Sequence, residues 1–238
     1  MKLVIPMSGY GSRFSVEGYK LPKPLIDVKG KPMVWWALKS LPEVPASDLI
    51  FIVNEKHIKE NDIDKVLKET FGYSIKIIIE NTEPTGQATT VLLAHMEINN
   101  DNPLVIYNCD TYAPTAKTRL LNAIQKFPEC DGFVPVFNSS APNLSYVKTD
   151  ASGIVTEVAE KRVISSDATI GLYHFKKGSD FVDAATEMKK KEIKVNNEYY
   201  VLPAYQFLIN KGKKIMKLAI DQIHVLGTPI ELNEFLKR

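Results

Sequence analysis

The stretch that decides the fold is LVIPMSGYGSRFSVEGYKLPKP, residues 3–24, which passes from an apolar run into glycines, an arginine and a lysine between prolines. Val4 and Ile5 are typical of a buried strand. Gly9 and Gly11 allow a tight turn and a close approach of the backbone to an anion. We therefore expect a phosphate-binding loop at the end of the first strand.

Arg13 and Lys23 supply the positive charge of this loop. Their charge alone does not give either residue a phosphate-binding role, because most of the 30 Lys and Arg residues of the chain are expected at the surface. Their positions are more specific, since Arg13 follows the two glycines and prolines on both sides of Lys23 restrict its backbone. Both side chains are predicted to bind phosphate oxygens. The loop is not a dinucleotide fingerprint, because Phe14 takes the place of the third small residue, and it lacks the Walker A pattern.

The composition is that of an ordinary globular protein, with 45% hydrophobic and 24% charged residues and a net charge of +2. This charge is too small to indicate a nucleic-acid or membrane partner. No apolar run reaches the roughly 18 to 20 residues of a membrane span, and no signal-peptide pattern is present, so a cytoplasmic protein is expected. Cys109 and Cys130 lack the spacing of a zinc site or a disulfide framework and are predicted to be buried free thiols.

Apolar runs alternate with helical periodicities over the first 137 residues. Strands are expected at residues 49–53, 75–79, 103–107 and 132–137, and helices near residues 32–41, 63–71, 86–98 and 120–127. The pattern then changes to short strands within residues 144–161 and 169–175 and to helices over residues 179–190 and 201–210. A capping pattern at Thr228, Pro229 and Glu231 predicts one last helix. We therefore expect an α/β fold with a mainly parallel sheet, followed by a smaller α+β part.

Two further motifs follow the opening loop, Pro22-Lys23-Pro24 and Gly30-Lys31-Pro32. Together with G-x-G-x-R they resemble the nucleotidyltransferase superfamily whose members make nucleotide sugars. The resemblance implies a Rossmann-like three-layer sandwich with a mostly parallel central sheet, and a loop folded over a triphosphate. Residues 1–238 would form one nucleotidyltransferase domain, in which residues 1–138 bind the NTP and residues 139–238 bind the acceptor.

The resemblance extends along most of the chain. The matching segments are Thr85-Gly86-Gln87-Ala88 (the base-reading turn), Asn108-Cys109-Asp110 (the metal aspartate at a strand end), Glu160-Lys161 (the sugar-phosphate pair), Gly171-Leu172-Tyr173 (the next strand) and Gly227-Thr228-Pro229 (a helix start). Glu198-Tyr199-Tyr200 lies near the acceptor region of the family.

These matches imply the residues of a site. The catalytic cations would be Arg13, Lys23 and Lys161. The NTP would be bound by Met7, Ser8, Gly9, Gly11, Ser12, Arg13, Lys23, Gly86 and Gln87. The acceptor would be bound by Glu160, Lys161, Gly171, Glu198 and Tyr199.

Asp110 is the implied ligand of a Mg²⁺ cofactor. It is expected at the carboxyl end of a central strand, where open α/β sheets bind ligands, and one carboxylate with substrate phosphates is an ordinary Mg²⁺ arrangement. The residue pattern alone also allows a loop-capping aspartate. Val225 stands where the family commonly has another aspartate, which leaves Asp221 and His224 as the nearby substitutes for a second metal ligand.

Several other residues also have a structural interpretation. Gln87 can read a base edge, because an amide both donates and accepts, or it can simply occupy the first turn of a helix. Glu160 and Lys161 suit an acceptor site or an exposed strand end. Thr228 is expected to be a helix cap, and Tyr199 is typical of core or pocket wall.

The predicted activity is transfer of NMP from an NTP to a phosphorylated small molecule, by resemblance a sugar 1-phosphate, with release of pyrophosphate. The pathway implied is synthesis of surface polysaccharide precursors, for capsule or lipopolysaccharide. Three alternatives stay open: a cytidylyltransferase with a non-sugar phosphate acceptor, a glycosyltransferase with a similar nucleotide-binding sheet, and a non-catalytic nucleotide-binding regulator. The partners expected are thus the NTP and the acceptor, without nucleic acid or membrane, and a homo-oligomer is compatible with the sequence.

Overall fold

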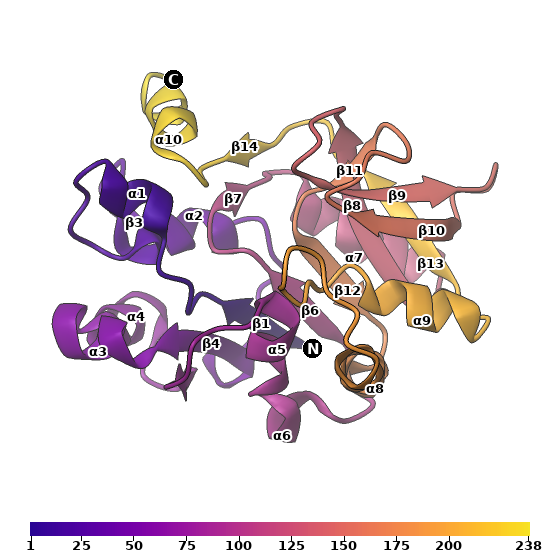
Figure 1. Ribbon diagram of the computed structural model, residues 1–238, viewed down its shortest axis with the longest axis horizontal. Helices are drawn as coiled ribbons and strands as arrows, with labels where there is room; N and C mark the ends of the chain where they lie inside the picture. Colours follow the sequence, from indigo (N-terminus) through magenta and orange to yellow (C-terminus); the bar gives the residue numbers. More distant parts are fainter.

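A ten-stranded mixed sheet forms the centre of the computed structural model, which describes residues 1–238 (Figure 1). Neighbouring strands follow the order β10-β9-β11-β8-β12-β6-β1-β4-β5, and β13 pairs with β8. The strands are β1 (Lys2–Pro6), β4 (Leu49–Asn54), β5 (Lys76–Glu80), β6 (Leu104–Tyr107), β8 (Gly132–Asn138), β9 (Ser145–Thr149), β10 (Val155–Glu160), β11 (Asp167–Thr169), β12 (Leu172–Phe175) and β13 (Ile215–Ala219). Four short strands form two separate pairs, β2 (Asp27–Val28) with β3 (Lys31–Pro32) and β7 (Thr111–Tyr112) with β14 (His224–Val225).

Four strands of the sheet, β1, β4, β5 and β6, are parallel neighbours. β1 pairs with β4 on one side and β6 on the other, with Leu3 opposite both Leu49 and Val105, and β4 pairs with β5. All these pairs are parallel, so the segments that follow β1, β5 and β6 meet at the carboxyl edge of the sheet. The predicted mostly parallel core of the sheet is confirmed.

A strand from the second half of the chain lies inside this sheet. β12 pairs antiparallel with β6 on one side and with β8 on the other, so β8 is not adjacent to the parallel set. The first 137 residues therefore do not form a continuous parallel sheet by themselves. The single strand predicted over residues 169–175 is also divided, because Gly171 at φ +79° bends the chain between β11 and β12.

Helices cover both faces of the sheet (Figure 1). They are α1 (Ser12–Val16), α2 (Met33–Leu38), α3 (Glu55–Asn61), α4 (Ile63–Phe71), α5 (Gln87–Leu92), α6 (His95–Ile98), α7 (Ala116–Lys126), α8 (Gly178–Lys190), α9 (Ala204–Asn210) and α10 (Pro229–Leu236), with two 3-10 turns at Lys23–Leu25 and Ala46–Asp48. Strand alternation sends Val4 into a core with α5, α8 and α9, and Leu3 and Ile5 into a core with α2, α4 and α7. The result is the expected three-layer sandwich.

The C-terminal helix packs against the opening loop (Figure 1). Phe14 of α1 shares a small buried cluster with Leu232 and Phe235 of α10. Thr228 is the N-cap of α10, and its hydroxyl accepts a hydrogen bond from the backbone N–H of Glu231 at 3.2 Å, which confirms the predicted cap. Both cysteines are buried and free, as predicted. None of the helices combines the length and apolar character that a membrane span needs.

Candidate active site

A cavity of about 660 Å³ opens at the carboxyl edge of the parallel strands. Its lining comes from both halves of the chain. All but one of the predicted site residues line it, namely Met7, Ser8, Gly9, Gly11, Ser12, Arg13, Lys23, Gly86, Gln87, Asp110, Glu160, Lys161, Gly171 and Glu198. The exception is Tyr199.

Lys23 and Asp110 form an ion pair in this cavity, with 2.7 Å between Nζ and Oδ2. Burial alone would lower the pKa of Lys23, but the charge of Asp110 outweighs it and raises that pKa above its usual value. Burial would likewise raise the pKa of Asp110, yet Lys23 keeps it below its usual value. Both groups therefore stay charged across the physiological pH range.

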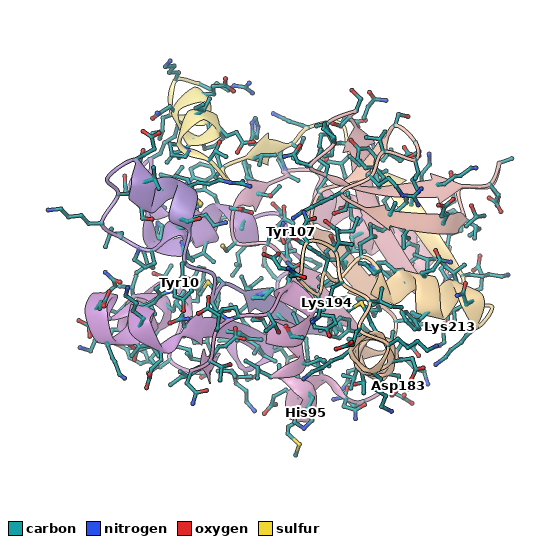
Figure 2. The ribbon with its side chains drawn as sticks, viewed as in Figure 1. Tyr10, His95, Tyr107, Asp183, Lys194 and Lys213 are labelled. Carbon is teal, nitrogen blue, oxygen red and sulfur yellow. The ribbon has the colours of Figure 1, made fainter.

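Hydrogen bonds of two neighbouring residues fix the strand end that carries Asp110. Tyr107, labelled near the centre of Figure 2, is fully buried, and its hydroxyl donates to the backbone oxygen of Thr111 at 2.8 Å. The hydroxyl of Thr111 lies 3.4 Å from Asp110 Oδ1. These contacts hold the carboxylate at the cavity wall.

Arg13 lies in the short helix α1, directly after the glycine turn. Gly11 has φ +63°, and a Cβ atom at this position would lie 3.1 Å from Lys23 Cβ, so the turn packs closely against the lysine. Arg13 forms no ion pair, although it lines the cavity and repels the charge of Lys23. Two neighbouring cations, one of them without a counter-charge, form a suitable site for an anion.

A buried network joins the opening loop to β5 and α5. The hydroxyl of Ser8 donates to the Glu80 carboxylate, and the hydroxyl of Thr90 donates to the same oxygen at 2.8 Å. Glu80 is 4% exposed and was not predicted from the sequence. The only sequence signal would have been a carboxylate at the end of an apolar strand.

The predicted base reader Gln87 is already hydrogen-bonded. Its Nε2 donates to Asn108 Oδ1 at 2.6 Å, which leaves its Oε1 and its second N–H for a ligand. Tyr10, labelled in Figure 2, also lines the cavity, and its hydroxyl donates to Glu83 Oε2 at 3.2 Å. Tyr10 and Glu83 are polar cavity residues that the motif comparison missed.

Glu160, Lys161 and Tyr200 line the part of the cavity that comes from the second half of the chain, where the acceptor was predicted to bind. Burial raises the pKa of Glu160, although the hydroxyl of Ser145 donates to its Oε2 at 2.6 Å. Lys161 has a left-handed backbone at φ 51°, and its Nζ donates to the hydroxyl of Tyr200. Glu160 and Lys161 thus lie in a cavity rather than at an open strand end.

Tyr199 must be corrected as an acceptor-binding residue. It is 6% exposed and packs in the hydrophobic core beside α5, whereas its neighbour Tyr200 lines the cavity. Backbone hydrogen bonds of Tyr199 with Thr85 and Ala88 hold this segment, so that the ring of Tyr199 lies in the core and the next residue faces the cavity.

The donors around Asp110 suit a metal that binds together with substrate phosphates. No group of three or more His, Cys, Asp or Glu side chains is arranged to hold a metal ion. Asp221 and His224 do not line the cavity, since Asp221 pairs with Arg119 and His224 stacks on Tyr112. The other carboxylate at this place is Glu231.

Glu231 lies across Gly227 from Asp110. A Cβ atom on Gly227 would be 3.1 Å from Asp110 Oδ2 and 3.6 Å from Glu231 Oε2. Two carboxylates around such a gap are oxygen ligands of the type that Mg²⁺ prefers, provided that phosphates and water complete the shell. The residues present therefore fit a divalent cation whose other ligands would be phosphate and water oxygens.

Comparisons with known proteins identify the family of the chain. Residues 2–214 match the family model described as Nucleotidyl transferase. Mannose-1-phosphate guanyltransferase 2 of Candida glabrata is 32% identical over 111 residues, which cover 46% of this chain and 30% of that protein. The mannose-1-phosphate guanyltransferase of Gibberella zeae is 27% identical over 181 residues, covering 74% of this chain and 49% of the relative. The chain thus matches about a third to a half of the length of these curated relatives.

Solved structures resemble the fold over its whole length. A nucleoside-diphosphate-sugar pyrophosphorylase from Vibrio cholerae RC9 superposes with a TM-score of 0.83 and 27% identity, covering 99% of this chain and all of the other. A UDP-glucose pyrophosphorylase complexed with UDP-glucose gives a TM-score of 0.77 at 16% identity, covering 99% of this chain and 97% of that chain, and shows the fold alone. With its family model matched over nearly the whole chain, the protein belongs to the nucleotidyl transferase family.

Proposed function

We propose that the protein transfers a nucleotidyl group from an NTP to a sugar 1-phosphate and releases pyrophosphate. One observation carries this proposal: a single cavity is lined by the two cations of the opening loop, Arg13 and Lys23, and by Lys161 from the second half of the chain. This arrangement supports a site for two anionic substrates. Residues 1–138 would bind the nucleotide and residues 139–238 the acceptor.

In the proposed reaction, an oxygen of the acceptor phosphate attacks the α-phosphorus of the NTP. The bond between the α-phosphorus and the bridging oxygen breaks, and pyrophosphate leaves in line. Arg13 and Lys23 would neutralise triphosphate oxygens, while Lys161 would bind the acceptor phosphate. Their main contribution is to hold two mutually repelling anions in position and to stabilise charge on the leaving oxygens.

Asp110 would hold a divalent cation, for which Mg²⁺ is the natural choice with oxygen ligands. A bound cation would neutralise charge on the phosphate oxygens. Lys23 now occupies Asp110 Oδ2 at 2.7 Å, so its ammonium would have to turn toward a phosphate when the cation binds. Glu231 is the carboxylate that would assist Asp110, since the side chain of Val225 has no ligand atom.

The choice of substrates is guided by the relatives. The curated relatives named above are mannose-1-phosphate guanyltransferases, and the alignment with the Candida glabrata protein covers 111 residues. GTP with a hexose 1-phosphate is therefore the first substrate pair to test. The pathway that we propose is synthesis of surface polysaccharide precursors. CTP with a non-sugar phosphate is the second pair.

The decisive experiment measures pyrophosphate release over a grid of four NTPs and a panel of phosphorylated acceptors, with Mg²⁺ present and with EDTA. We expect release with one preferred pair and none without acceptor. NTP binding without pyrophosphate release from any pair would instead favour a nucleotide-binding regulator. Release of free nucleoside diphosphate from a nucleotide sugar would favour a glycosyltransferase.

A further inference from the structure

Tyr200 holds the ammonium group of Lys161 in two ways. Lys161 Nζ donates a hydrogen bond to the Tyr200 hydroxyl, and the same nitrogen lies 4.5 Å from the centroid of the Tyr200 ring. Both side chains line the cavity on its acceptor side. The proposed reaction gives Tyr200 no role of its own, and its contact with Lys161 is therefore a separate feature of the cavity.

The partner of Lys161 differs in kind from the partner of Lys23. Lys23 pairs with a carboxylate, which neutralises its charge, whereas Lys161 forms no ion pair. A tyrosine hydroxyl accepts a hydrogen bond without cancelling the charge. An ammonium has three N–H donors, so the bond to Tyr200 leaves two for an anion. Lys161 is thus held by a neutral hydroxyl rather than by a carboxylate.

The backbone fixes both members of this contact. Lys161 adopts φ 51°, a conformation that is uncommon for a residue with a side chain. Next to Tyr200, the Tyr199 N–H donates to the Thr85 oxygen at 3.0 Å, and the Tyr199 oxygen accepts from the Ala88 N–H at 2.8 Å. The segment that carries Tyr200 is therefore clamped to the turn at the start of α5.

The Tyr200 hydroxyl also stays protonated. Burial raises the pKa of Tyr200, and the neighbouring Glu198 carboxylate raises it further. The hydroxyl can therefore accept a hydrogen bond from Lys161 and still has its own proton to donate.

We propose that Tyr200 is the positioning residue of Lys161, and that its hydroxyl holds the ammonium at the place where the acceptor phosphate binds. This inference rests on the proposed function. A free lysine side chain loses much rotamer entropy when it is ordered on a ligand, and an anchor that is already present removes part of that cost. Tyr200 thereby favours acceptors with a phosphate in reach of Lys161.

The test is a double-mutant cycle of Tyr200→Phe and Lys161→Ala, read as KM and kcat for the preferred pair. Tyr200→Phe should raise the KM of the acceptor about tenfold, as expected for a lost hydrogen bond to a charged group, with little change in kcat or in the KM of the NTP. In the Lys161→Ala background, Tyr200→Phe should have no further effect. An unchanged acceptor KM, or equal effects in both backgrounds, would overturn the inference.

Tyr73→Phe is the matched control, because Tyr73 is 79% exposed and outside the cavity. Urea unfolding of the wild type and of all four variants, the double variant and the control included, checks that the variants fold. A wild-type protein that is inactive with every pair would refute the proposed function separately. In that case calorimetric titration with inorganic phosphate tests the positioning role by itself. About tenfold weaker phosphate binding in Tyr200→Phe than in the wild type, with no such difference in the Lys161→Ala background, supports the role. Equal phosphate binding by the wild type and Tyr200→Phe, or no phosphate binding by the wild type, refutes the positioning role.

Discussion

The ammonium of Lys23 lies 2.7 Å from the carboxylate of Asp110, although 87 positions separate them in the chain. One residue follows β1 and the other follows β6, and the pairing of these strands brings the two together. Replacing either partner leaves the other charge poorly compensated in a largely buried place, at a cost of several kcal/mol.

Asp110→Asn should therefore reduce pyrophosphate release by about 100-fold or more, because it removes both the proposed metal ligand and the anchor of Lys23. Titration of Mn²⁺ in the presence of the preferred NTP, followed by electron paramagnetic resonance, should show weaker binding of the ion. Asp101→Asn is the control, since Asp101 is 79% exposed and outside the cavity. Full activity and unchanged Mn²⁺ binding in Asp110→Asn would refute the assignment.

Arg13→Ala should lower kcat/KM by about 100-fold, because one preorganised charge donor is worth roughly 3 to 4 kcal/mol in comparable sites. Its stability in urea should hardly change, since Arg13 forms no ion pair in the folded protein. Arg119→Ala provides the comparison, because Arg119 pairs with Asp221 at the surface. Similar rates for the two variants would show that Arg13 does not contact substrate.

The stability of the protein should fall in mild acid because of His174. Neither ring nitrogen has a hydrogen-bond partner, and burial lowers the pKa of His174 to about 4. In the unfolded chain the pKa is near 6.5, so between these values only the unfolded state binds the proton, and stability is lost as the pH falls. The loss from this residue should approach roughly 3 kcal/mol at pH 4.

Urea unfolding of the wild type and of His174→Phe between pH 7 and pH 4 tests this expectation. The variant should lose less stability than the wild type over this range, while His95→Phe, a change at an exposed site on α6 (Figure 2), should follow the wild type. Equal pH dependence in all three proteins would contradict the expectation.

Gly86→Ala should be among the most damaging single changes in the chain. Gly86 has φ +131°, and a Cβ atom there would lie 2.5 Å from the backbone oxygen of Tyr199. We expect a loss of more than about 3 kcal/mol of unfolding free energy, since both backbone strain and a backbone clash arise. Gly153→Ala has φ +85° and open space, so it should cost only about 1 kcal/mol. Comparable urea midpoints would show that the turn can move.

Local patterns in the sequence are enough to predict the positions of the opening loop and of Asp110. The opening loop follows a buried strand, and Asp110 stands at the end of another, so their place at the carboxyl edge followed from strand geometry. The Lys23–Asp110 pair did not follow, because no local pattern states which distant charges meet. Glu80 was missed for the same reason, since its partners Ser8 and Thr90 lie on other elements.

The second half was harder to predict because its strands pair out of order. β12 lies between β6 and β8, and only tertiary pairing determines this position. The motif Glu198-Tyr199-Tyr200 does not distinguish its two tyrosines, because the backbone hydrogen bonds of Tyr199 to a distant turn decide which ring enters the core. A shift of one residue along this segment is enough to exchange core and cavity.

The place of β12 in the sheet also limits how the protein can move. A strand from the second half of the chain is hydrogen-bonded on both sides to strands of the first, so rotating one half against the other would break backbone bonds in the middle of the sheet. We therefore expect the sheet beneath the cavity to move as one body. In the proposed reaction, entry of the nucleotide and departure of the products would then depend on the loops at the rim of the cavity rather than on a hinge within the sheet.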